Sequence, residues 1–153
     1  MGQFTRLIHS LLKNPEKSGE IFKKIKIRGT AQIIFRKTLL KAYNSKCAIC
    51  GISYKSALQA AHIIPWSKAS FKQRMDIGNG LLLCANHHSL YDKGHIKIHD
   101  DYTLFINPKL KQLSQSDRSL TTSFHLKKLI LPKNELWWPK RHFLAARRNS
   151  YNP

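Results

Sequence analysis

Apolar residues recur at helical spacing near the start of the chain. In QFTRLIHSLLK, residues 3–13, they are three or four positions apart, which predicts an amphipathic helix. The polar break NPEKSG follows. A second helix is predicted from about Thr30 to Tyr43, with one apolar face made of Phe35, Leu39, Leu40 and Tyr43.

The middle of the chain alternates short apolar runs with turn-forming residues. ALQAAHII predicts a strand that ends at Pro65, and GLLLC predicts a second, buried strand. The segment between them, Trp66 to Gly78, is predicted to be a polar loop. ANHHSLYDKG predicts a short helix with Gly94 just past its end. HIKIHDDYTLFI predicts a hairpin with the acidic pair in its turn.

The last part of the chain, residues 107–153, shows a weaker pattern. Pro132 and Pro139 interrupt it, Trp137 and Trp138 are predicted to pack inward, and RHFLAARR predicts a basic terminal helix. No internal repeat is visible. Short strands mixed with helices predict an α+β fold in a single domain with helical extensions.

Charge is unevenly distributed along the chain. The sequence has 27 Lys and Arg against 8 Asp and Glu, a net charge of +19. Residues 1–46 hold 11 basic and 2 acidic side chains, residues 47–106 hold 6 and 4, and residues 107–153 hold 10 and 2. Such a charge attracts polyanions, with nucleic acid as the first partner and an anionic membrane surface as the second. Two basic flanks favour nucleic acid, because membrane-binding proteins more often concentrate charge in one segment.

The cysteines and the hydropathy predict a cytoplasmic protein. No stretch approaches the roughly eighteen apolar residues of a membrane span, and the start of the chain lacks a signal-peptide pattern. The three cysteines, an odd and small number, indicate reduced thiols and not a disulfide framework.

Two short pairs of metal-binding residues lie in the central segment. Cys47 and Cys50 form one Cys-x-x-Cys pair, and Cys84 and His87 form a Cys-x-x-His pair. Three thiolates and one imidazole predict a closed, tetrahedral, structural Zn²⁺ site. The alternative is that the cysteines are small buried apolar residues and the histidine lies on a helix surface. A thioredoxin-like redox role is less favoured, because no parallel βαβ pattern surrounds the pair.

A second set of residues carries candidate chemistry. Successive helical positions point about 100° apart, so His87 and His88 cannot easily face one ion. Asp92 lies four residues after His88 on the same face, which gives half of a divalent-metal site with open positions. His62, at the end of the first strand, is a candidate general base because histidine titrates near neutral pH. Asn79 could hold the loop or orient the imidazole of His62. Singly, each has an ordinary structural explanation.

These residues, in the setting Cys-x-x-Cys…AHIIPW…GNGLLLC-x-x-HH…YDKG, resemble the HNH endonuclease family. The resemblance is closest to the HNH domains of restriction-type endonucleases. It implies a small ββα-metal core with a structural zinc knuckle over residues 28–106. A helical N-terminal extension (1–27) and a basic C-terminal extension (107–153) would complete a single nuclease domain.

The resemblance also implies an activity, which is metal-dependent hydrolysis of DNA phosphodiester bonds of restriction or phage-defence type. His62 would activate water, Asn79 would fix the loop, and His88 with Asp92 would hold Mg²⁺ or Mn²⁺ on the scissile phosphate. Many family members have Asp or His before the catalytic histidine, whereas this chain has Ala61. Ala61 favours the alternative function, a zinc-stabilised nucleic-acid-binding module without catalysis.

The basic flanks are expected to bind the phosphates of double-stranded DNA. One such site cuts one strand at a time, so a double-strand break would need a homodimer or a partner protein. The predicted phosphate contacts, all basic and all in the flanks, are Arg28, Arg36, Lys37, Lys41, Arg141, Arg147 and Arg148.

Overall fold

The computed structural model describes residues 2–19, 28–108 and 114–150, and its centre is a two-stranded sheet. Strands β1 (Leu58–His62) and β2 (Gly80–Cys84) pair antiparallel, with His62 opposite Gly80. Every residue of β2 is buried, in agreement with its uninterrupted apolar sequence. Both predicted strands are confirmed.

Helix α5 (Ala85–Asp92) follows β2 without a loop and completes a ββα unit. It ends where Gly94 takes a φ of 73°, a left-handed conformation that glycine adopts without strain. The amide of Gly94 then donates to the carbonyl of Tyr91, and the amide of His95 donates to that of Leu90. The predicted α+β fold with a ββα core is confirmed.

A hairpin follows α5, as predicted. Strands β3 (Ile96–Ile98) and β4 (Leu104–Ile106) pair antiparallel, and the acidic pair lies in the turn between them. In each strand the first and last residues are buried while the middle residue is partly exposed.

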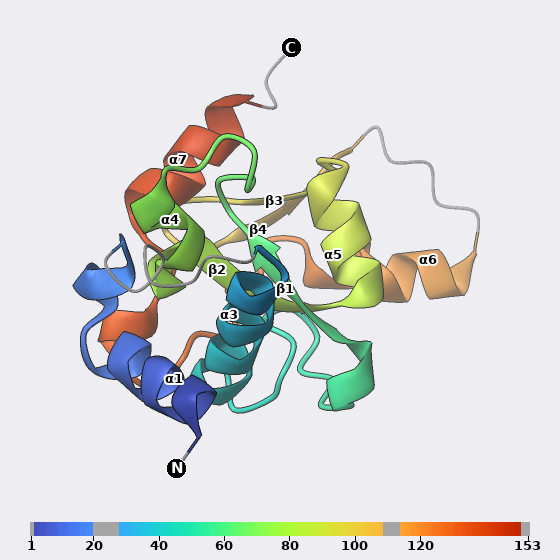
Figure 1. Cartoon of the computed structure of the whole chain (residues 1–153). Coiled ribbons are helices and arrows are strands. Elements are labelled where there is room, and N and C mark those ends of the chain that lie inside the picture. The colour runs from blue at the N-terminus through green and yellow to red at the C-terminus, as the bar shows by residue number, and fades with distance from the viewer. Residues whose placement is uncertain (1, 20–27, 109–113, 151–153) are drawn as a thin grey trace.

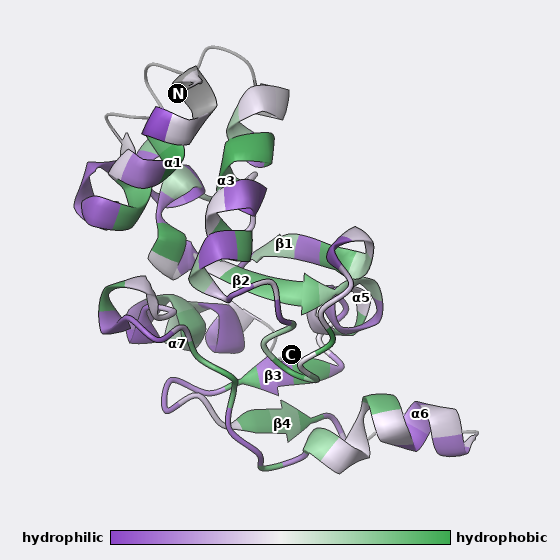
Figure 2. Ribbon diagram, turned by 90° about the horizontal axis from the view of Figure 1, so that it is seen from below, coloured by the Kyte–Doolittle hydropathy of each residue, from purple (hydrophilic) through white to green (hydrophobic). Residues whose placement is uncertain are grey.

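Two helices from the N-terminal part of the chain lie side by side (Figure 1). They are α1 (Gln3–Lys13) and α3 (Arg28–Ala42), and α3 also packs against β1 and β2 (Figure 2). Most of the predicted apolar face is buried: Phe35 is 1% exposed and Leu39 is 0% exposed, whereas Leu40 is partly buried. The helix begins two residues before the predicted start.

The C-terminal region also packs against the core. It contains α6 (Gln115–Leu120) and α7 (Arg141–Ser150), so the basic terminal helix is confirmed. Trp137 and Trp138 pack against the core, as predicted, and the indole nitrogen of Trp137 donates to the Leu12 carbonyl at 2.9 Å. This contact joins the C-terminal region to helix α1. Single 3₁₀ turns lie at Pro15–Lys17, Lys55–Ala57, Ile77–Asn79, Thr122–Phe124 and Glu135–Trp137.

The prediction of a polar loop between β1 and β2 is partly wrong. It contains helix α4 (Phe71–Met75), which begins with a capping box in which Ser70 and Gln73 exchange side-chain and main-chain hydrogen bonds. Met75 at its end is fully buried. The polar composition concealed a short helix that has a local cap and one fully buried apolar residue at its end.

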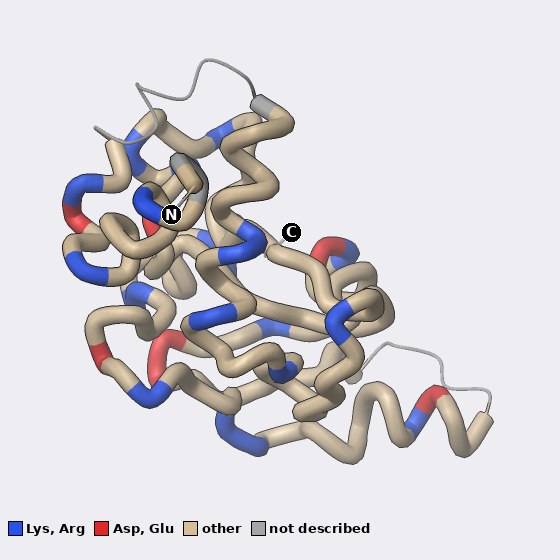
Figure 3. The backbone as a smooth tube through the Cα atoms, turned by 60° about the horizontal axis from the view of Figure 1, so that its bottom comes forward, with Lys and Arg blue, Asp and Glu red and all other residues tan. Residues whose placement is uncertain are grey.

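Lys and Arg are spread over most elements, whereas Asp and Glu are few (Figure 3). Among the described residues no helix is both long and apolar enough to cross a bilayer.

Candidate functional site

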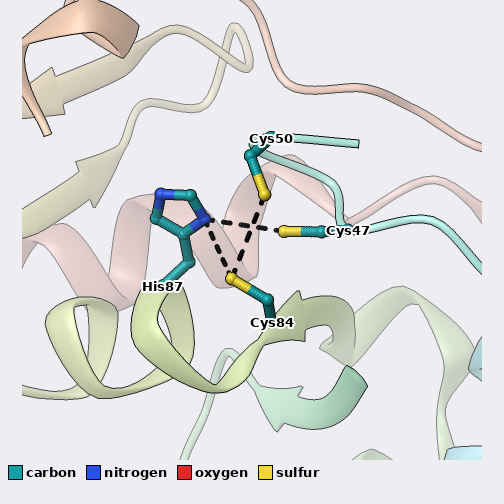
Figure 4. A group of neighbouring side chains, drawn as sticks. All are labelled: Cys47, Cys50, Cys84 and His87. Carbon is teal, nitrogen blue, oxygen red and sulfur yellow. Dashed lines mark hydrogen bonds between the residues drawn. The ribbon is translucent and has the colours of Figure 1, made fainter. Parts of the chain in front are cut away.

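Three cysteines and one histidine converge at the junction of β2 and α5 (Figure 4). Cys47 and Cys50 come from the turn between α3 and β1, Cys84 ends β2, and His87 lies in the first turn of α5. The Nδ1 atom of His87 is 3.3 Å from the Cys84 sulfur and 3.7 Å from the Cys47 sulfur. The sulfurs of Cys50 and Cys84 are 4.0 Å apart, and all four atoms lie within 4.8 Å of one another.

These separations fit a tetrahedral ion. Bonds of about 2.3 Å to sulfur and about 2.0 Å to nitrogen give tetrahedron edges of about 3.8 Å between sulfurs and about 3.5 Å between sulfur and nitrogen. The three separations given above lie close to these edges. The cluster could therefore hold a metal ion such as zinc.

Local hydrogen bonds orient the ligand atoms toward the centre of the cluster. The amide of Gly51 donates to the Cys47 carbonyl at 2.9 Å, and a φ of 74° at Gly51 closes the turn. On the opposite side, Nε2 of His87 donates to the Leu120 carbonyl at 2.9 Å. A carbonyl only accepts, so Nε2 carries the proton and the lone pair of Nδ1 faces the sulfurs.

The pKa values of the thiols differ within the cluster. A hydrogen bond from Cys84 lowers the pKa of Cys47, while burial raises the pKa of Cys50. A bound metal ion would favour the thiolate form of all three, with release of protons.

A second group of side chains lines a cleft of about 340 Å³ on the other side of α5. His62, His88 and Asp92 all face it, so the structure brings together the predicted base and the predicted metal ligands. Ala60, Pro65, Trp66 and Arg147 complete its lining.

The imidazole of His62 is held from two sides. It stacks on Phe35 with ring centroids 4.2 Å apart and an interplanar angle of 13°, and its Nε2 donates to the Arg74 carbonyl at 2.9 Å. The proton on Nε2 leaves the Nδ1 lone pair available as a base. Burial lowers the pKa of His62, so the ring is neutral at neutral pH.

Asn79 is fully buried and holds the loop after β1. Its Oδ1 accepts from the Ile64 amide at 2.7 Å, and its Nδ2 donates to the Gln73 carbonyl at 2.9 Å. Of the two roles considered from the sequence, these bonds support holding the loop. They act on His62 indirectly, because the next carbonyl along the chain, that of Arg74, accepts from the imidazole.

His88 and Asp92 form a pair at the exposed side of the cleft. Nε2 of His88 lies 3.1 Å from Oδ2 of Asp92, and Nδ1 of His88 donates to Oε1 of Gln59 at 2.6 Å. Adjacent ligands on an octahedral cation with bonds of about 2.1 Å are about 3.0 Å apart, so the pair fits a cation as well as a hydrogen bond. No local sequence signal pointed to Gln59, whose role depends on the packing of α5 against β1.

Ala61 is fully buried opposite Leu81 and offers no ligand atom to the cleft. Any cation held by His88 and Asp92 would therefore receive no side-chain ligand from position 61. The two ligands both come from α5.

The predicted DNA contacts differ in their surroundings. Lys37, Lys41 and Arg141 are exposed. Arg148 pairs with Asp100 at 2.9 Å, and the guanidinium of Arg36 donates to the carbonyls of Lys55 and Leu58. Helix α3 begins at Arg28, but the side chain of Arg28 lies outside the described part of the structure.

Arg147 differs from the other predicted contacts. Its side chain is only 5% exposed, and its guanidinium donates to main-chain carbonyls and to Asp92. It links buried groups of several elements and lines the cleft, whereas its place in the basic RHFLAARR segment suggested an exposed position. No local pattern could have indicated this, because its acceptors lie at least 55 residues away.

Comparisons with known proteins bear on the family and the fold. Residues 47–99 match a family model described as HNH endonuclease. Among solved structures, a "Modification dependent TagI restriction endonuclease" matches with a TM-score of 0.51 and 20% sequence identity, over 76% of this chain. The match covers 37% of that protein, so this chain spans little more than a third of its length. No curated protein matches the chain.

The cluster of four ligands predicts that Cys47→Ala loses bound metal and stability together. We expect less than one zinc ion retained per chain, and a loss of about 3 kcal/mol or more in unfolding free energy, or about 6–12 °C in Tm. Metal analysis after gel filtration and thermal unfolding measure the two effects. His88→Ala is the control and should retain the zinc. Full zinc retention by Cys47→Ala would show that this cluster is not the metal site.

Proposed function

We propose that this chain, whose residues 47–99 belong to the HNH endonuclease family, hydrolyses DNA phosphodiester bonds with a divalent cation. The observation that carries the proposal is the convergence of His62, His88 and Asp92 on one cleft. A base with an available lone pair and two ligands for a cation are the groups that phosphodiester hydrolysis requires.

In the proposed reaction, Nδ1 of His62 accepts a proton from a water molecule. The water oxygen forms a bond to phosphorus, and the bond from phosphorus to the 3′ oxygen breaks, giving a 5′-phosphate and, after protonation, a 3′-hydroxyl. His88 and Asp92 would hold Mg²⁺ or Mn²⁺, which when bound stabilises negative charge on the scissile phosphate and the leaving oxygen. Asn79 keeps the loop that positions the Arg74 carbonyl against His62.

We infer that the ion at the cysteine cluster is Zn²⁺ and that its role is structural. Three thiolates and one imidazole are a typical donor set for zinc, and they leave no open coordination position. The ion would join the turn after α3, the end of β2 and the start of α5. The direction in which the His88 side chain projects from α5 depends on this connection between the three segments.

The distribution of basic residues supports DNA as the substrate. His62 also lines a second cleft, of about 260 Å³, together with Gln32, Phe35 and Arg36 of α3. Helices α3 and α7, from the two basic flanks, thus border the clefts on either side of His62. Lys37, Lys41 and Arg141 are exposed on these helices and are the proposed phosphate contacts.

We further propose that residues 1–153 form one nuclease domain of restriction type. The Trp137–Leu12 hydrogen bond and the packing of α1 on α3 join the flanks to the core. The restriction type rests on the structural match to a restriction endonuclease, and the greater part of that protein has no counterpart in this chain.

The first prediction from this proposal concerns His62→Ala. We expect plasmid cleavage with Mg²⁺ or Mn²⁺ to fall by about 10²–10⁴-fold, because the general base is removed. Zinc content and DNA binding should stay as in the wild type. His9→Ala, on the exposed face of α1, is the matched control. Equal cutting by wild type and His62→Ala would exclude the catalytic role, and DNA binding without cutting by the wild type would favour the non-catalytic module.

A second prediction concerns the cation. His88→Ala and Asp92→Ala should each raise the Mn²⁺ concentration needed for half-maximal cleavage by about 10-fold or more, because each removes one ligand. The measurement is a metal titration of the cleavage rate. An unchanged metal requirement in both variants contradicts the ligand assignment.

A third prediction follows from the lowered pKa of His62. A protonated imidazole cannot accept a proton from water, and burial favours the neutral ring down to a lower pH than usual. The single-turnover cleavage rate should rise with pH, reach half its maximum below pH 6.5, the ordinary value for histidine, and stay level through neutral pH. Half-maximal cleavage above pH 6.5 at saturating Mn²⁺ would contradict this.

A further inference from the structure

A buried arginine from the C-terminal helix links the two sides of the candidate active site. Nη1 of Arg147 donates to the carbonyls of His62 at 3.2 Å and Ile63 at 2.9 Å. Nη2 donates to the Tyr91 carbonyl at 3.3 Å and to Oδ1 of Asp92 at 3.1 Å. The guanidinium carbon lies 4.0 Å from the centre of the Tyr91 ring.

These acceptors lie on two different elements. His62 and Ile63 are at the end of β1, and Tyr91 and Asp92 are at the end of α5. One nitrogen of the planar guanidinium donates to the end of β1 and the other donates to the end of α5. The fixed geometry of the group thereby sets the distance between these two elements. Its charge is also balanced, because the same contacts include a carboxylate and three carbonyls.

This link matters because the base and the proposed metal ligands are on different elements. A cation bound to His88 and Asp92 would be held by α5 alone, since Ala61 offers no ligand from β1. The cation therefore does not itself fix α5 to β1. The hydrogen bond between Gln59 and His88 is one connection, and it lies on the exposed side of the site. Arg147 makes a buried connection between the end of β1 and α5.

We propose that Arg147 is a positioning residue for the nuclease reaction, an inference that rests on the proposed function. It sets the separation between His62 and the cation, and it holds Asp92 by Oδ1 so that Oδ2 faces Nε2 of His88. Helix α7 is thus part of the active site although none of its residues lies within the matched segment 47–99.

The test compares Arg147→Lys with the wild type. Lysine keeps the charge but has one ammonium group, which cannot reach acceptors on both elements in the same geometry. We expect a folded, zinc-containing variant whose Mn²⁺ affinity, measured by calorimetry without DNA, is about 10-fold weaker. Single-turnover cleavage at saturating Mn²⁺ should fall by about 10²-fold, because the base and the cation are no longer held at the separation that the reaction requires.

Two further variants separate positioning from stability. Lys128→Met removes another aspartate-paired basic side chain, whose partner Asp101 lies in the hairpin turn, and should match the wild type in every measurement. In an Asp92→Ala background, Arg147→Lys should weaken Mn²⁺ binding no further but should still slow cleavage. This pattern is expected only if Arg147 acts on the cation through Asp92 and on the base through β1.

Several outcomes would overturn the proposal. One is a folded Arg147→Lys with wild-type Mn²⁺ affinity and cleavage rate. Another is loss of the fold in both Arg147→Lys and Arg147→Met, which would make the residue a core element only. If the wild type binds Mn²⁺ but cuts no DNA, the proposed nuclease function fails. The Mn²⁺ affinities then still test whether Arg147 positions Asp92.

Discussion

The arrangement of the whole site depends on how the start of α5 is fixed. His87 is directed into the cysteine cluster by its neighbours, with Nδ1 on the sulfurs and Nε2 on the Leu120 carbonyl. Because the next helical position points about 100° away, His88 must leave the cluster and face the cleft. Asp92, one turn further along, follows on the same face. The ion proposed for the cysteine cluster and the cation proposed for the cleft would therefore each use one of two adjacent histidines, without competition.

The remaining groups of the site are held by buried hydrogen bonds. His62 is fixed by the Arg74 carbonyl, and Asn79 fixes the loop that supplies it. Buried polar groups are costly unless they are satisfied, so a network of this kind has few alternative arrangements. A fixed arrangement would suit the proposed reaction, in which a base, a cation and a phosphate must meet within a fraction of an ångström. Arg147 extends the same network to α7.

The elements that local sequence patterns predicted are the ones whose stability is decided locally. The spacing of apolar residues in α3, the apolar run of β2 and the glycine after α5 each act within a few residues. The spacing between Cys47 and Cys50, and between Cys84 and His87, is similarly only three residues. Helix α4 was missed because its polar composition outweighed the Ser70–Gln73 cap, which is also a local signal.

By itself the sequence determined which ligand types and which candidate base the chain possesses, in which order, and that its flanks are basic. Only the tertiary structure decided which basic residue is exposed and which is buried. Arg141 and Arg147 belong to one helix, yet Arg141 is exposed and Arg147 is buried. The Arg147 guanidinium forms hydrogen bonds to the end of β1 and to α5. Burial and long-range partners arise from the packing of segments that are distant in sequence, and the pattern within one segment does not encode them.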